Sequence, residues 1–278
     1  MAAAKAFYAK VVGWGARDAS TPDLAYALFT AEDVAVSGLM NLPEEARKLG
    51  ATPRWMGYVD VNDVDTIAGR IKGLGGAVYV PPTDTNIGRI SLVADPQTAT
   101  LALVKGLKLG QQQSADPSEP GHVGWHELVA ADWKKVFAFY GEIFGWQKVD
   151  AENVPTDKYQ LFSAGGQTIG GMFTKHRMEP APFWIFYFNV GDIDATVERI
   201  KTGGGNIFGS LHELPDGSWI ARCTDPQGAT FAIQGTRSQD GVGRVPVSEV
   251  GWSTDWGGFS SRGRLLDATP RGKRRTSD

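Results

Sequence analysis

The chain has 278 residues, which exceeds one typical domain and suits two. Hydrophobic residues make up 42% and charged residues 21%, an ordinary composition for a globular protein. The formal net charge of −3 gives no electrostatic reason to expect a nucleic acid or a membrane as a partner. The one cysteine, Cys223, excludes an intramolecular disulfide framework and any cysteine-based zinc cluster, and we expect it to lie in a strand as a small hydrophobe.

The N-terminal segment is rich in alanine, but Lys5 and Lys10 interrupt it, so it lacks the apolar core of a signal peptide. No apolar run reaches the length of a membrane span; residues 183–190 are strand-sized and contain Asn189. We therefore expect a cytoplasmic protein.

The first helix predicted from the sequence is the start of an internal repeat. Its apolar residues follow the i, i+3, i+4, i+7 spacing of one helix face, and the same pattern recurs at a constant offset later in the chain. A glycine ends each copy, as expected for a C-cap. The matched residues are Ala4, Phe7, Tyr8, Val11, Val12, Gly13 and Trp14 in the first copy and Val136, Phe139, Tyr140, Ile143, Phe144, Gly145 and Trp146 in the second.

The repeat continues in the same order through strands, a second helix and a closing hairpin. Asp63 and Asp192 are predicted to cap the two second helices. The hairpin turn at residues 225–228 has a proline in its second position and a glycine in its fourth, whereas the turn at residues 95–98 ends in Thr98. The matched segments are residues 26–31 and 159–164, 38–40 and 171–173, 55–61 and 184–190, 64–71 and 193–200, and 95–104 and 225–234.

The repeat divides the chain into a first module at residues 1–106, a polar linker at 107–119 and a second module at 120–236. A tail at residues 237–278 follows, in which the repeat pattern stops. The basic run at residues 271–275 is interpreted as part of a solvated tail in preference to a nucleic-acid site.

The two copies differ at their starts. Residues 122–129 predict a strand before the first helix of the second copy, and the first copy has no such strand because Met1 already lies at the helix start. A lost strand exposes the hydrogen-bonding edge of its neighbour. Either the true start lies upstream of Met1 or another segment fills the position. The tail at residues 246–256 is one candidate, because its Val-Gly-Trp sequence repeats that of residues 123–125.

The element order, the Phe-Tyr and Gly-Trp pairs of the first helix, the glycine pair after the second helix and the Asp-Pro turn together resemble the vicinal-oxygen-chelate superfamily of glyoxalases, bleomycin resistance proteins and dioxygenases. The resemblance extends over residues 2–235. It implies an α+β fold of two tandem βαβββ modules that form a cup-shaped mixed sheet, with the first module lacking its N-terminal strand. Members include lyases, dioxygenases and metal-free drug-sequestering proteins, so the resemblance indicates the fold more strongly than the function.

The resemblance also locates the positions where the family carries its metal ligands, on the inner face of the cup. None of the five positions that can be tested carries an imidazole, carboxylate or thiolate, the groups that bind divalent cations. We therefore predict no metal and no other cofactor. The five positions are Trp125, Ile185 and Ala232 in the second copy and Met56 and Ala102 in the first.

Candidate catalytic residues lie in the second copy. The resemblance implies that Trp125 faces the cup, and strand alternation then puts Glu127 in the cup and His126 on the opposite face. Glu127 would be desolvated there, which makes it either an acid/base group or a carboxylate paired with a polar neighbour. His212 and Glu213 are candidates for a general base, or for an ordinary surface loop pair. His122 and His126 share one strand face and form a candidate metal pair, or two polar residues on an outer face.

Aromatic residues that recur in both copies suggest a ligand-binding face, or part of the core. The predicted ligand-binding residues are Trp125, Tyr187, Tyr159, Ile185, Tyr26 and Tyr58.

The favoured function is metal-independent binding of a small aromatic or drug-like molecule. The first alternative is a divalent-metal-dependent enzyme, either a glyoxalase-like lyase or a dioxygenase-like oxidoreductase. The second alternative is a metal-free hydrolase or isomerase that uses Glu127. The expected partner is a small molecule, with no nucleic acid and no membrane, and the chain is expected to be a two-module monomer or a homodimer.

Overall fold

The computed structural model of the chain describes residues 1–107, 118–150 and 158–237. Most of the predicted linker, the predicted tail beyond residue 237 and the candidate surrogate strand at residues 246–256 lie outside the described residues. No helix in the described ranges combines the length and the apolar character needed to cross a membrane.

The second copy forms one continuous mixed sheet of eight strands. Two successive βαβββ units build it, one starting at β8 and the other at β12, and these two strands pair antiparallel in the middle of the sheet. The two predicted tandem modules are confirmed, and the structure shows that a complete module holds two βαβββ units. The elements are β8 (Val123–Ala130), α4 (Trp133–Phe144), β9 (Gln147–Val149), β10 (Tyr159–Ala164), β11 (Gln167–Thr174), β12 (Phe183–Asp192), α5 (Ile193–Thr202), β13 (Asn206–Glu213), β14 (Trp219–Thr224) and β15 (Thr230–Thr236).

From its first helix onward the first copy has the element order of the second, apart from an added helix between β3 and β4, but its sheet is divided. Strands β1, β2 and β3 form one piece, and β4, β7, β6 and β5 form another. No described strand lies between β3 and β4, which is the place that β8 takes in the second copy. The elements are α1 (Ala2–Val11), β1 (Gly15–Asp18), β2 (Tyr26–Ala31), β3 (Val34–Met40), α2 (Glu44–Lys48), β4 (Tyr58–Asp60), α3 (Val64–Gly73), β5 (Ala77–Thr85), β6 (Gly88–Ala94) and β7 (Thr100–Lys105).

The strand predicted at residues 55–61 is shorter than its sequence pattern suggests, since only β4 (Tyr58–Asp60) is in a ladder. Its counterpart β12 (Phe183–Asp192) pairs with β8 on one side and β15 on the other, whereas β4 pairs only with β7 among the described strands. A strand with one partner has fewer ladder hydrogen bonds to hold its ends, which explains the difference.

The predicted local features of the helices are confirmed. The carboxylates of Asp63 and Asp192 accept hydrogen bonds from the backbone N–H groups of Thr66 and Ala195 at 3.0 and 2.9 Å, as N-caps do. Cys223 is fully buried in β14, as a small hydrophobic residue would be. Most residues predicted to form the buried helix faces are buried, including Val64, Ala68 and Ile71 in α3 and Ile193, Val197 and Ile200 in α5, whereas Val12 and Phe144 are half-buried.

The turns of the two closing hairpins differ at one residue whose backbone conformation is strained in the first copy. Gly228 adopts a φ of 87°, and its counterpart Thr98 adopts a φ of 80°, a region that a β-branched residue rarely enters. We expect Thr98→Gly to raise the free energy of unfolding by about 0.5–1 kcal/mol, because the steric strain removed exceeds the added flexibility of the unfolded chain. Urea denaturation measures the change, and Gly228→Thr is the matched control, expected to lower stability. Equal stability of wild type and Thr98→Gly would contradict the assignment of strain.

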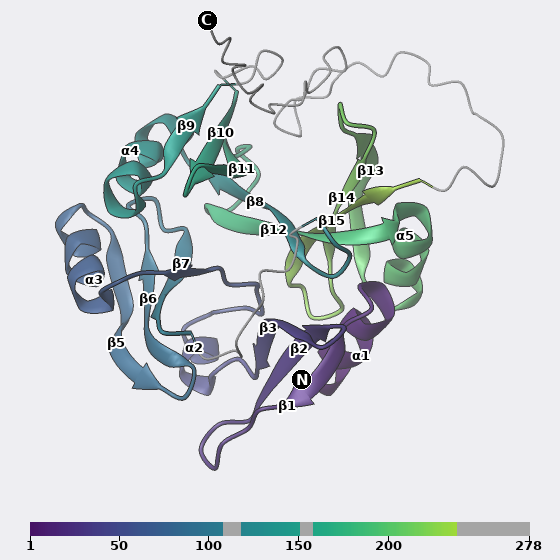
Figure 1. Cartoon of the computed structure of the whole chain (residues 1–278), viewed down its shortest axis with the longest axis horizontal. Helices are drawn as coiled ribbons and strands as arrows, with labels where there is room; N and C mark the ends of the chain where they lie inside the picture. The colour runs from purple at the N-terminus through teal and green to yellow at the C-terminus, as the bar shows by residue number, and fades with distance from the viewer. Residues whose placement is uncertain (108–117, 151–157, 238–278) are drawn as a thin grey trace, which may run out of the picture.

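The two copies pack against each other through their helices. In Figure 1, α1 of the first copy lies beside α5 of the second, and α3 of the first lies beside α4 of the second. Aromatic residues from both copies pack together beside α1. In this cluster the ring centroids of Trp14 and Trp55 each lie 4.9 Å from that of Phe188. The copies therefore share one core.

A duplicated polar link crosses this interface. The hydroxyl of Tyr8 in α1 donates to Asp225 at 3.0 Å, and the equivalent hydroxyl of Tyr140 in α4 donates to Asp95 at 2.9 Å. Each aspartate belongs to the closing hairpin of the other copy. The indoles of Trp55 and Trp184 donate to the same tyrosine oxygens at 2.8 and 3.3 Å. The repeated Phe-Tyr pair of the sequence thus anchors each helix to the opposite copy.

Candidate functional site

The sheet of the second copy has two distinct faces. Helices α4 and α5 cover one face, where the ring of His126 packs edge-on against Phe186 at a centroid distance of 5.9 Å. Trp125 and Glu127 point to the other face, which we call the inner face. The predicted alternation along this strand is therefore confirmed.

A buried carboxylate network occupies the inner face. The two oxygens of Glu127 accept hydrogen bonds from the hydroxyls of Tyr159 at 2.9 Å and Tyr187 at 2.8 Å. The indole N–H of Trp125 donates to the Tyr159 oxygen at 3.0 Å. We call these four residues the Glu127 cluster. The structure thus brings together four of the residues predicted as catalytic or ligand-binding, and Ile185 lies directly opposite Glu127 on β12.

Backbone geometry explains why the cluster fits. In the β8–β11 register Glu127 lies opposite Gly171. The Tyr159 ring rests over that glycine, since a Cβ atom built there would lie 2.2 Å from two ring carbons. Any larger residue at position 171 would push the ring away, so the glycine permits the hydroxyl to reach the carboxylate.

Burial dominates the electrostatics of the cluster. Desolvation raises the pKa of Glu127 above its ordinary value, and the hydrogen bonds from Tyr187 and Tyr159 oppose that effect. Desolvation and the nearby Glu127 charge hold the pKa of Tyr159 and of Tyr187 well above 10. The tyrosines therefore remain proton donors at neutral pH, and Glu127 is the group of this cluster with a tendency to take up a proton.

Half-buried side chains surround the cluster on the inner face. Trp125, Phe183 and Ile220 pack against its buried residues, and the guanidinium of Arg222 lies 4.8 Å from the centroid of the Phe183 ring. Arg222 also forms an ion pair with Glu179 at 3.0 Å. The sequence analysis missed Phe183, Arg222 and Glu179. Strand alternation was the available signal, because Arg222 is two residues from Ile220 and so shares its face.

His212 and Glu213 are not part of this cluster. They lie on β13 instead of in a surface loop, so that alternative is wrong. After a register shift between Phe208 and His212, β13 still pairs with β14 as far as Glu213 and Trp219. Strand β13 is four places from β8 in the sheet, which corresponds to about 19 Å at the usual strand spacing. Burial lowers the pKa of His212, and Glu213 is exposed.

The two histidines of the candidate metal pair, His122 and His126, have different surroundings. His126 Nδ1 lies 2.9 Å from the carbonyl oxygen of Ile169, and burial lowers the pKa of this histidine. Both ring nitrogens of His122 are buried, and among the described residues neither has a hydrogen-bond partner. Within residues 1–107, 118–150 and 158–237, no three His, Cys, Asp or Glu side chains form a group suited to a metal ion.

The three mapped ligand positions on the inner face carry no donor for a divalent cation. Trp125, Ile185 and Ala232 occupy the three predicted ligand positions of the second copy and lie together in the apolar cluster of this face. The carboxylate of Glu127 already accepts two hydrogen bonds. These residues do not fit a metal centre, since none of the three mapped positions carries a donor atom of the usual kind.

The first copy contributes Tyr26 and Tyr58 on its own inner face. Tyr26 lies over Gly38, because a Cβ atom built there would lie 2.5 Å from the ring carbon that bears the hydroxyl. Its side chain is 7% exposed and that of Tyr58 is 43% exposed. Burial, followed by the nearby Tyr58, raises the pKa of Tyr26 to about 12. These tyrosines correspond to Tyr159 and Tyr187.

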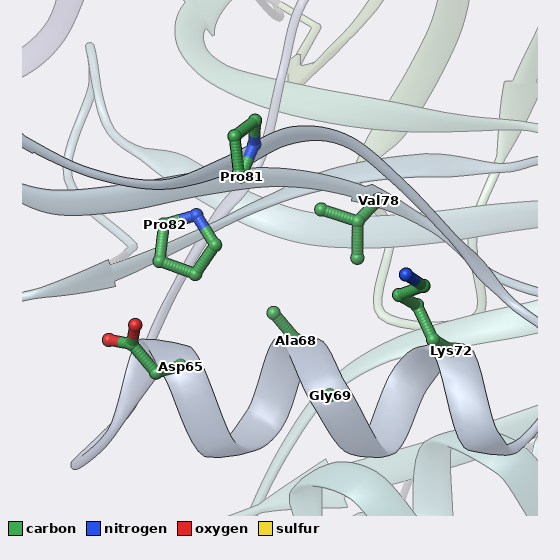
Figure 2. Close-up of a pocket in the computed structure, with 7 residues that line it drawn as sticks. All are labelled: Asp65, Ala68, Gly69, Lys72, Val78, Pro81 and Pro82. Atoms are coloured by element: carbon green, nitrogen blue, oxygen red, sulfur yellow. The ribbon is translucent and has the colours of Figure 1, made fainter.

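A surface pocket of about 360 Å³ lies between α3 and β5 of the first copy, and none of its lining residues belongs to the Glu127 cluster. Figure 2 shows Asp65 and Lys72 at opposite ends of the pocket, with two prolines of β5 across from the helix. Asp65 is held by Arg89 at 2.6 Å, and no aromatic side chain lines the pocket, so we assign it no function. Its lining is formed by Asp65, Ala68, Gly69, Lys72, Val78, Pro81 and Pro82.

Two βαβββ units per module, arranged in tandem, are the fold of the glyoxalase-like proteins, and the family model agrees. The chain belongs to the Glyoxalase/Bleomycin resistance protein/Dioxygenase superfamily, whose model matches residues 1–103 and 120–233. The resemblance found from the sequence is therefore confirmed.

Relatives of similar sequence have names that point to different roles. The Mycobacterium tuberculosis protein CFP32 is provisionally named a glyoxylase. It is 30% identical to this chain over 235 residues, which cover 83% of this chain and 88% of that protein. The anthracycline biosynthesis protein DauV of a Streptomyces species is 29% identical over 251 residues, covering 84% of this chain and 88% of its own. The Mn(II)-bound glyoxalase of Novosphingobium aromaticivorans has a similar fold, with a TM-score of 0.59 and 16% sequence identity. The match covers 85% of this chain and 78% of that protein.

Proposed function

We propose that the chain binds a small, planar aromatic molecule with an acidic oxygen on the inner face of the second copy, without a metal ion. The single observation that carries this proposal is the arrangement of half-buried Trp125, Phe183 and Arg222 around the buried Glu127 cluster. Indole and phenyl rings offer flat apolar contact area, and a guanidinium pairs with an anionic oxygen.

The chemistry of this face favours binding over metal-dependent catalysis. The mapped ligand positions carry Trp125, Ile185 and Ala232, whose side chains add contact area and no metal donor. The similarity to an anthracycline biosynthesis protein supports an aromatic ligand of polycyclic type. A metal-dependent lyase or dioxygenase would need a donor set drawn from other residues.

A second candidate function is metal-free proton transfer by Glu127. One observation favours it: the carboxylate is buried and its pKa is raised, so it takes up and releases protons nearer neutral pH than an exposed glutamate does. The two tyrosine hydroxyls would hold the carboxylate in place. This activity would require a ligand that reaches past Trp125 to the carboxylate.

The binding proposal is tested by titrating the protein with alizarin, a dihydroxyanthraquinone, and with anthraquinone-2-carboxylate, following tryptophan fluorescence and melting temperature. We expect saturable quenching and a rise in melting temperature. Trp125→Ala should weaken binding about tenfold, and Arg222→Gln should weaken binding of the carboxylate probe by a similar factor.

The control variant is Trp219→Ala, which removes a half-buried tryptophan that packs with the helix-covered core. It should leave both affinities unchanged. Equal losses from Trp125→Ala and Trp219→Ala would place the binding elsewhere. Metal analysis of protein purified without a tag or chelator is the second control, and one bound equivalent of metal per chain would contradict the metal-free proposal.

A further inference from the structure

An ion pair borders the inner face of the second copy. The guanidinium of Arg222 on β14 lies 3.0 Å from the carboxylate of Glu179 and 4.8 Å from the centroid of the Phe183 ring. The side chain of Arg222 is 12% exposed, and that of Glu179 is 30% exposed. The arginine therefore has little access to water, whereas the carboxylate approaches it from a more open position.

Glu179 lies in the connection between β11 and β12 and not in a strand of the sheet. Its backbone N–H donates to the carbonyl oxygen of His176 at 3.0 Å, and its own carbonyl oxygen accepts a hydrogen bond from Lys175 Nζ at 2.6 Å. Among the described residues its carboxylate binds only Arg222. The side chain can therefore rotate away from Arg222 while the backbone of the connection stays in place.

The second carboxylate near Arg222 is Glu127, and it is not free to move in this way. Glu127 is 6% exposed and accepts hydrogen bonds from the hydroxyls of Tyr159 and Tyr187. Moving its carboxylate would take that acceptor away from two buried hydroxyls, which is costly. Glu179 is thus the carboxylate that a ligand can replace on Arg222.

The strand register shows how wide a ligand must be to use both Arg222 and the indole of Trp125. Arg222 lies opposite Ala232, Ala232 lies opposite Tyr187, and Tyr187 lies opposite Trp125, so the four residues form one row across the sheet. The row covers three strand spacings, about 14 Å between the outer backbones. A flat ligand that touches the indole and reaches the guanidinium has to bridge most of this width, which requires more than one ring.

We propose that Glu179 occupies the subsite of the ligand's acidic group, and that a polycyclic aromatic carboxylate binds by displacing Glu179 from Arg222. This inference rests on the proposed function. Arg222 then has a counter-charge both in the free protein and in the complex, as a charge with little access to water requires. A neutral ligand of the same shape leaves the ion pair closed and gains no charge-assisted hydrogen bond, so Glu179 makes the site selective for acids.

The test compares anthraquinone-2-carboxylate with the neutral anthraquinone-2-carboxamide in fluorescence titrations of wild type and Glu179→Gln. We expect Glu179→Gln to bind the carboxylate about three- to tenfold more tightly, because the competitor for Arg222 is gone, and to bind the carboxamide as wild type does. The same substitution should lower the melting temperature of the free protein, because it removes a counter-charge of Arg222. An ion pair with a purely structural role would lower the melting temperature without strengthening carboxylate binding.

Variants of the arginine and of a distant glutamate complete the test. In an Arg222→Gln background, Glu179→Gln should no longer strengthen carboxylate binding. If it still did so, repulsion by the Glu179 charge, and not exchange at Arg222, would explain the gain, and the proposal would be overturned. Glu198→Gln is the matched control, because Glu198 forms an ion pair with Lys201 on α5 at 2.8 Å, and it should change neither affinity.

The outcomes separate this inference from the proposed function. Carboxylate binding by wild type with no gain in Glu179→Gln would overturn the exchange and leave aromatic binding in place. Absence of binding of both probes to both proteins would contradict the proposed function, and the exchange with it.

Discussion

Glu127→Ala is expected to lower the free energy of unfolding by about 3–5 kcal/mol. The substitution leaves the hydroxyls of Tyr159 and Tyr187 buried without their acceptor and opens a cavity on the inner face. Glu127→Gln should cost far less, since the amide oxygen still accepts a hydrogen bond. Urea denaturation at several pH values measures both changes.

The pH dependence of the free energy of unfolding distinguishes the effect of the Glu127 charge from that of the size and shape of its side chain. Because burial raises the pKa of Glu127 in the folded state, the folded protein binds this proton more tightly than the unfolded chain does. The contribution of Glu127 to stability is therefore greatest below its ordinary pKa of 4.5 and falls as the pH rises through the raised value. Relative to wild type, Glu127→Gln should become more stable as the pH increases across that window.

The control for this experiment is Glu213→Gln, a change at an exposed glutamate of the same copy. It should alter neither the stability nor its pH dependence by a measurable amount. If Glu127→Gln were as destabilising as Glu127→Ala at every pH, the ionised carboxylate itself would be required, contrary to the effect of burial described above.

Local sequence patterns predicted much of this fold. The apolar spacing of the helices, the capping residues Asp63 and Asp192 and the strand alternation that separates Glu127 from His126 depend on neighbours only a few residues away. The duplication strengthened the helix predictions, because the apolar spacing and the capping residues were each seen twice. For the same reason the family was recognisable before the fold was known.

The rest depended on contacts between distant parts of the chain. Glu179 follows β11 and Arg222 lies on β14, so only the folded sheet brings them together. The length of β4 depends on which strand pairs beside it. His212 and Glu213 lie in β13 because of their pairing with β14, which no local turn pattern revealed. The oligomeric state, the cytoplasmic location and the absence of a cofactor stay predictions.

The duplicated link between Tyr8 and Asp225 is expected to be essential for joining the copies. The Asp225 carboxylate accepts hydrogen bonds from the Tyr8 hydroxyl and from the backbone N–H groups of Gln227 and Ala229. Asp225→Ala removes the buried acceptor of all three hydrogen bonds, so we expect a loss of about 3–5 kcal/mol in the free energy of unfolding. Tyr8→Phe removes one hydrogen bond, and we expect a loss of about 1–2 kcal/mol.

A double-mutant cycle separates the link between copies from the local turn. If the tyrosine acts mainly through the aspartate, the effect of Tyr8→Phe should largely disappear in the Asp225→Ala background, whereas additive effects would contradict the link. The same cycle at Tyr140 and Asp95 is the internal replicate, and Asp216→Ala, at an exposed turn, is the control. Because each tyrosine lies in one copy and its aspartate in the other, coupling in both cycles would show that neither module reaches its full stability without the other.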